Sequence, residues 1–285
     1  GYMVDSTIDV TASRTANSNW YAYADATQTI TPRGLGLETV SPPTWVGTGP
    51  GKAQGTSPLT FTDSIPVGTT YTLLFGQLLC ASATLPTITT TIGGQSATLV
   101  DSVYASPTGG NYLYGFCFAL ANPPTGSQTV TFTSNSILVC AVNTVHYSGV
   151  GSLGPVSKIG QQAGQPSFSV GTDAKYGYAQ AFLYAAAAAG NGFSSYNQNQ
   201  RWTASRWSRC LLIGDATGNG GTLTFSATRD NTTNGWGAIV VPLAPVSAGA
   251  IYGATAATAL PITATRLATV TWAAISRPST GCSRR

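Results

Sequence analysis

The chain has 285 residues, of which 42% are hydrophobic and only 8% charged, and its formal net charge is +4. One Glu, three Lys and one Met leave few strong helix formers, whereas abundant Thr, Val, Gly and Pro favour strands and turns, so composition predicts an all-β protein. The mild net charge and the lack of an apolar stretch of ~18 residues lead us to expect neither a nucleic-acid partner nor membrane insertion.

Residues 1–40 contain two short stretches that resemble a third near the other end of the chain. Ser6–Arg14, Ala26–Arg33 and Thr258–Arg266 each place Thr in alternation and finish on Arg. The pattern predicts extended β-arms at both termini, residues 1–40 and residues 246–285, the second with a basic tail. Chance similarity in a Thr- and Ala-rich chain is the alternative interpretation.

Residues 41–245 read as one β-domain bounded by turn residues, with Pro42-Pro43 at its entry and Pro245 at its exit. Strand-like runs alternate with Gly and Pro turns, and no strand–helix alternation is visible. From Tyr176 to Tyr184 large residues alternate with small ones, which predicts a strand with two different faces. We therefore expect an antiparallel β-sandwich, jelly-roll-like in architecture.

Catalytic chemistry has few candidates in this sequence, which contains one His, eight Asp and one Glu. His146 ends an apolar strand-like run, and a triad with Ser148 or Asp101 lacks the Gly-x-Ser-x-Gly signature that would support it. We interpret His146 as structural and expect no catalytic residue, no metal ligands, no cofactor and no enzymatic activity.

Each of two glycine-rich segments can be interpreted as a ligand-binding loop or as an ordinary structural turn. Gly149–Gly154 matches a dinucleotide-binding spacing, but Pro155 follows directly, so we expect a tight loop. Gly214–Gly221 offers Asp215 and Asn219 as calcium ligands, but a hairpin turn explains it better. Five widely spaced cysteines suggest neither zinc binding nor a closed disulfide set, which fits assembly in a reducing cytoplasm.

One cluster combines aromatic and cationic side chains over nine positions. Its members are Arg201, Trp202, Arg206, Trp207 and Arg209. Such residues stack on sugar rings and hold carboxylates or phosphates. A regular strand would place Trp202 and Trp207 on opposite faces, so packing with edge charges is the alternative to a glycan or partner site.

The segments Asn122–Phe132, Ala141–Val150 and Trp236–Leu243 resemble the β-sandwich modules of minor tail proteins from actinobacterial phages, and Ala257–Arg266 resembles the repeats ending in Thr-Ala-Thr-Arg of such proteins. The resemblance implies a virion component of the tail that is assembled in the host cytoplasm. It would dock on other virion proteins through its arms, form a homo-oligomer and display the sandwich, with a host cell-envelope glycan as a candidate target. A lectin-like glycan-binding module and a capsid decoration or head-fibre protein are the alternative hypotheses.

Overall fold

The computed structural model describes residues 40–108, 111–185, 192–206, 209–230, 232 and 234–247. Within these residues every regular element is a strand and all the strand pairs are antiparallel, which confirms the predicted all-β class. No helix in this part of the chain has the length and apolar character needed to span a membrane. The predicted arms lie outside the described residues, apart from a few positions next to the sandwich.

The larger sheet uses the first part of the chain. Its path is β1-β9-β4-β7-β6-β5-β8-β3, and β2 also pairs with β9. The strands are β1 (Thr44–Thr48), β2 (Lys52–Gln54), β3 (Leu59–Ile65), β4 (Tyr71–Cys80), β5 (Ile88–Ile92), β6 (Gln95–Thr108), β7 (Asn111–Ala121), β8 (Gly126–Ser134) and β9 (Val139–Ser148).

The second sheet follows the path β10-β19-β13-β16-β15, with β11 also paired to β19. Two short pairs, β12 with β17 and β14 with β18, complete the described strands. The bounds are β10 (Val150–Leu153), β11 (Ser157–Gln162), β12 (Ser167–Gly171), β13 (Gly177–Ala185), β14 (Phe193–Ser194), β15 (Asn199–Arg206), β16 (Arg209–Thr217), β17 (Thr222–Ser226), β18 (Thr228–Arg229) and β19 (Trp236–Pro245).

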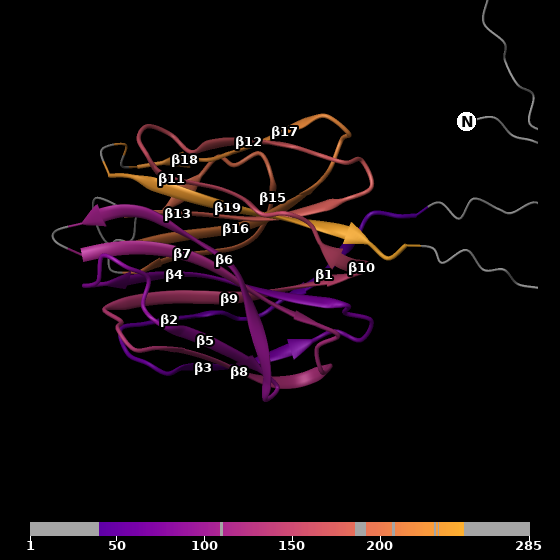
Figure 1. Ribbon diagram of the computed structural model, residues 1–285, viewed down its shortest axis with the longest axis horizontal. Helices are drawn as coiled ribbons and strands as arrows, with labels where there is room; N and C mark the ends of the chain where they lie inside the picture. The colour runs from indigo at the N-terminus through magenta and orange to yellow at the C-terminus, as the bar shows by residue number, and fades with distance from the viewer. Residues whose placement is uncertain are drawn as a thin grey trace, which may run out of the picture. The chain divides into compact units, whose positions relative to one another are not determined.

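The larger sheet curls back on itself into a nearly closed barrel, visible in the lower half of Figure 1. Strands β3, β5 and β8 cover one face of β4, β7 and β9, and the apolar residues between them form one core. Phe116 from β7 stacks on Phe132 from β8, with ring centroids 4.9 Å apart. This explains why β4 and β7 are apolar on both faces, since each face meets a different core.

Side chains, rather than a ladder of main-chain bonds, close the barrel between β2 and β3. Lys52 Nζ donates to the Thr60 carbonyl at 2.9 Å, and Gln54 Nε2 donates to the Pro58 carbonyl at 2.8 Å. These donors occupy acceptors on the outer edge of β3. Side-chain hydrogen bonds to main-chain carbonyls of this kind protect an edge strand from pairing with another chain.

Two further cores lie on either side of the second sheet. Leu73 of β4 belongs to the core between the sheets, together with Leu183 of β13 and Ile239 of β19. On the far face of β13, Phe182 packs in a third core beneath β12 and β17. The alternation read from residues 176–184 is therefore confirmed, because Tyr178, Phe182 and Tyr184 lie in one core and Ala179, Ala181 and Leu183 in the other.

The first and last described strands meet at one turn. Thr44 of β1 pairs with Ser148 of β9, Val150 of β10 pairs with Pro245 of β19, and Val246 N donates to the Gly149 carbonyl at 2.8 Å. Figure 1 shows the start of β1 and the end of β19 on the same side. The polypeptide chain therefore enters and leaves the sandwich beside the turn between β9 and β10.

Both glycine-rich segments depart from the expected conformations. Gly149 makes the expected turn with φ of 71°, but Val150–Leu153 continues as β10, since this stretch pairs with the edge of β19. In the other segment, Asp215 lies within β16, and the turn begins only after Thr217. It is not a hairpin, because β17 pairs with β12 rather than with β16.

Candidate functional site

Arg201 is placed by a bulge in edge strand β15. The register between β15 and β16 shifts between Gln200 and Trp202, so Arg201 is the additional residue. A bulge redirects a side chain relative to the regular pleat. Arg201 meets Asp215 of β16 through two parallel bonds, Nε to Oδ2 at 2.7 Å and Nη2 to Oδ1 at 2.8 Å. This bidentate geometry is the strong form of an Arg–carboxylate pair.

Asp215 also accepts hydrogen bonds from two further residues. Tyr147 Oη donates to Oδ2 at 3.2 Å, and Asn199 Nδ2 donates to Oδ1 at 3.2 Å. Asp215 is 8% exposed and Arg201 is 19% exposed, so the pair is largely shielded from water. Burial, followed by the neighbouring carboxylate, raises the pKa of Tyr147 well above its ordinary value. Tyr147 therefore remains a neutral donor, and its bond to Asp215 links the larger sheet to the second one.

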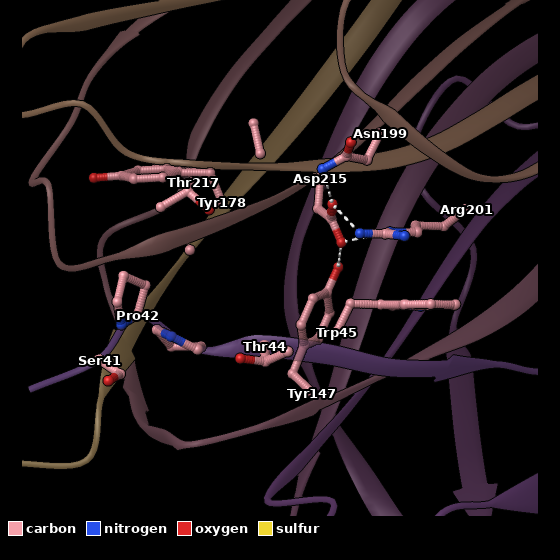
Figure 2. A pocket seen from close by; sticks show the side chains of 13 residues that line it. Ser41, Pro42, Thr44, Trp45, Tyr147, Tyr178, Asn199, Arg201, Asp215 and Thr217 are labelled. Carbon is pink, nitrogen blue, oxygen red and sulfur yellow. Dashed lines mark hydrogen bonds and ion pairs between the residues drawn. The ribbon is translucent and has the colours of Figure 1, made fainter.

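The indole of Trp45 completes this network from β1. The guanidinium carbon of Arg201 lies 4.1 Å from the ring centroid, within the range of a cation–π contact. Trp45 Nε1 donates to Thr48 Oγ1 at 3.0 Å, which holds the ring in place. Figure 2 shows Arg201 between the carboxylate and the indole. We call Trp45, Tyr147, Asn199, Arg201 and Asp215 the cross-sheet cluster.

The cross-sheet cluster forms one wall of a pocket with a volume of about 540 Å³. The opposite walls come from the entry segment before β1 and from the ends of β13 and β16, as Figure 2 shows. The lining residues outside the cluster are Ser41, Pro42, Pro43, Thr44, Gly177, Tyr178, Ala216 and Thr217. A smaller hollow of about 260 Å³ shares Tyr178 and is otherwise mostly apolar, with Pro155, Tyr176 and Pro242 in its lining.

The cluster predicted from sequence is divided by the fold. Arg201 reaches the pocket, whereas Trp202 is half-buried and packs against the core between the sheets. Arg206 and Arg209 lie opposite each other in the register of the β15–β16 ladder, at the end away from Asp215. The Arg206 side chain and the whole of Trp207 lie outside the described residues. Of the described side chains, Arg201, Trp202 and Arg209 therefore do not meet in one site.

Sequence reasoning missed most of the cross-sheet cluster. Trp45 and Tyr147 are distant from Arg201 in the chain, and only the meeting of β1 and β9 with the second sheet brings them close. Asp215 was considered only as a calcium ligand, in company with Asn219. In the structure Asn219 Oδ1 instead accepts from the Gly221 amide at 2.9 Å and the Thr172 hydroxyl at 2.7 Å. The one available signal was the inclusion of Arg201 in the cluster predicted from sequence.

His146 lies in a buried chain of hydrogen bonds that the sequence did not reveal. Its Nε2 is 3.1 Å from Asp63 Oδ2, and its Nδ1 is 2.9 Å from Thr72 Oγ1. Thr144 Oγ1 donates to Asp63 at 2.5 Å. The order hydroxyl–imidazole–carboxylate matches a catalytic triad, but all four residues are buried and none lines either pocket described above.

The imagined triad partners of His146 are engaged elsewhere. Ser148 Oγ donates to the Thr44 carbonyl, and Asp101 pairs with Lys158 at 2.6 Å on the outer flank of the sheets. The buried chain joins β3 to β4 and β9, which gives it a structural role in barrel closure. Across the described residues, no group of three or more His, Cys, Asp and Glu is placed to hold a metal ion.

Comparison with known proteins gives no assignment, since neither a family model nor a curated protein matches this sequence.

Proposed function

We propose that this chain is a non-catalytic structural component of a phage virion, most consistent with a minor tail protein that docks through its terminal arms. The sequence resemblance supplies the class. The observation that carries the docking model is the shared exit of the sandwich, where Thr44 lies opposite Ser148 and Val246 bonds to Gly149. Both arms are thereby tethered to the same end of the domain.

A single tethered end has a direct geometric consequence. Cys80 of β4 and Val139 of β9 lie at the other end of their ladders from the shared exit, since Tyr71 pairs with Tyr147 at the exit side. The loops 81–87 and 135–138 therefore lie at the opposite end of the larger sheet. Arms held by neighbouring subunits would leave these loops directed away from the attachment point.

The surface near the exit carries two exposed apolar side chains and little charge. Val67, in the turn before β4, is 89% exposed, and Val246 is 52% exposed. Single exposed apolar side chains are common on protein surfaces, and Leu138 at the opposite end is 45% exposed, so these two valines are compatible with a partner at the exit but do not select it. The low charge of the chain agrees, because a surface covered in an assembly has less need of solubilising charge. Other virion proteins and further copies of this chain are the partners we propose.

The proposal is tested by locating the chain and then removing an arm. Gold-labelled antibody on purified virions should mark the tail, whereas label on the head would favour a decoration or head-fibre protein. Absence of label would refute a virion role. Deleting residues 246–285 should abolish incorporation while the sandwich keeps its β-sheet circular dichroism.

A matched control changes the opposite end of the sandwich. Replacing loop 81–87 with a Gly/Ser segment of equal length should leave incorporation intact. Equal incorporation of the arm deletion and this control would contradict docking through the C-terminal arm.

A further inference from the structure

We propose that the pocket bounded by the cross-sheet cluster binds a neutral saccharide, with one sugar ring in the larger pocket and a second ring over the adjoining apolar hollow. This inference goes beyond the proposed virion role, because it concerns a small ligand of the chain itself. It does not depend on which particle the chain belongs to. Of the described residues that the sequence had suggested for binding, it keeps Arg201 and leaves out Arg209, which lies at the other end of the β15–β16 ladder.

The pocket has the size of a small-molecule site, and the wall formed by Arg201 is held by several contacts. Its volume of about 540 Å³ falls within the usual range of about 300–1,000 Å³ for ligand pockets. Arg201 is fixed from two sides, by the carboxylate of Asp215 and by the indole of Trp45. A preformed wall lowers the ordering cost of binding.

Electrostatic balance selects a neutral ligand. The positive charge of Arg201 faces the negative charge of Asp215 at 2.7 Å, so the wall carries no net charge. Asp215 already accepts from Arg201 twice, from Tyr147 and from Asn199, which fills the about four lone-pair sites of a carboxylate. An anionic ligand would have to compete with Asp215 for Arg201, and a cationic ligand would have to compete with Arg201.

The groups that remain for a ligand are alcohols and an amide oxygen. Tyr178 Oη accepts the Asp173 amide at 2.8 Å, which leaves its own O–H to donate. Thr44 and Thr217 contribute hydroxyls to the lining, and the Oδ1 of Asn199 is available as an acceptor because its bond to Asp215 uses Nδ2. Mixed donors and acceptors of this kind match the hydroxyl groups of a sugar.

Apolar surface beside these groups suits the C–H faces of sugar rings. Pro42 and Pro43 line the larger pocket, and Trp45 is 37% exposed at its edge. Beyond Tyr178, the smaller hollow presents the ring of Tyr176 and the prolines Pro155 and Pro242. Tyr178 lines both hollows, so the polar pocket and the apolar one adjoin at this residue, within reach of two linked sugar rings.

A polypeptide is the rival occupant of this pocket. Ser41 forms part of the lining, and residues 1–39 continue directly from it. Extended segments also use proline- and aromatic-lined grooves. The hydroxyl-rich lining and the balanced Arg–Asp pair favour the saccharide. The experiment below uses the full chain, so that an arm already seated in the pocket would appear as a failure to bind sugar.

The test is isothermal titration of the full chain with a panel of neutral disaccharides built from glucose, galactose, mannose and arabinose. Glucuronic acid and a sulfated oligosaccharide serve as anionic comparisons. We expect millimolar affinity for at least one neutral disaccharide, weaker binding of its monosaccharides and weaker binding of the anionic sugars. No neutral binding at about 10 mM, where the standard free energy would be only about −3 kcal/mol, or a preference for anionic sugars, would overturn the proposal.

Three variants locate the site while leaving the Arg–Asp pair intact. Tyr178→Phe and Thr217→Val each delete a hydroxyl with little change of shape, and each should weaken binding about two- to tenfold, the size of one neutral hydrogen bond. Trp45→Ala should weaken it further. Lys158→Met, on the other flank of the sandwich, is the matched control and should bind normally. Unchanged affinity in both hydroxyl variants, with wild-type circular dichroism, would also overturn the proposal.

Discussion

Two ion pairs lie near opposite edges of the second sheet, Arg201–Asp215 within that sheet and Lys158–Asp101 between the two sheets, and their different exposure predicts different energies. Arg201 and Asp215 are 19% and 8% exposed, whereas Lys158 and Asp101 are 46% and 28% exposed. Removing one partner of a well-shielded pair costs about 3–5 kcal/mol, because the other charge stays buried without a counterion. Exposed pairs contribute only about 0–1 kcal/mol.

For Asp215→Ala we expect a loss of about 3 kcal/mol in the free energy of unfolding, at the lower end of the buried range because Arg201 keeps some solvent contact. The Tyr147 hydroxyl also loses its acceptor at a buried position. A double-mutant cycle with Arg201→Ala should give a coupling energy of about 2 kcal/mol, against at most about 1 kcal/mol for Lys158→Ala with Asp101→Ala.

The assay is urea unfolding of the full chain, followed by tryptophan fluorescence and by far-ultraviolet circular dichroism. Coincident transitions are required before the four free energies of a cycle are combined. A coupling energy below about 0.5 kcal/mol for Arg201 and Asp215, or equal coupling energies in the two cycles, would show that shielding from water does not strengthen this ion pair.

Three further predictions follow from packing, ionisation and edge protection. The fold raises the pKa of Tyr147, so its contribution to the free energy of unfolding should be fully present below about pH 10, where the unfolded Tyr ionises. This contribution should decrease as the pH rises further. Tyr147→Phe should reduce the alkaline loss of stability, measured as the urea midpoint at each pH. Gly76→Ala should cost about 1–3 kcal/mol, because its Cβ would lie 2.3 Å from the Phe116 ring, and unchanged thermal stability would contradict this. Lys52→Met should leave stability nearly unchanged but promote self-association measured by light scattering, since the Thr60 carbonyl on the β3 edge loses its donor.

The sequence predicted the parts of the fold that depend on local pattern. The alternation of Leu59-Thr-Phe61 in the sequence is part of a strict buried–exposed pattern that runs through β3 to Ile65. The run Tyr71–Cys80 is more continuously apolar, a pattern that predicts a strand covered on both faces, and β4 is buried on both faces. Such a run does not specify which layer covers each face, so the curling of the larger sheet into a barrel was not foreseen.

The candidate site was harder to predict, because long-range pairing creates it. In a regular strand, the side chains of Arg201 and Trp202 would point to opposite faces. The bulge after Gln200 changes the direction of the Arg201 side chain relative to this alternation. Trp45 and Tyr147 come from the other sheet and carry no local mark of their role. Only the inclusion of Arg201 in the sequence-predicted cluster pointed toward this pocket.

The shared exit beside Ser148 and Val150 also determines how the domain would carry mechanical force. If the two arms were pulled apart from each other, β1 would peel from β9 from its Thr44 end, so ladder bonds would break one after another. If both arms were held and the opposite loops were pulled, the force would run along β9 and β19, and many bonds would share it in shear. The same strands would thus yield readily to separation of the arms and resist traction on the distant loops.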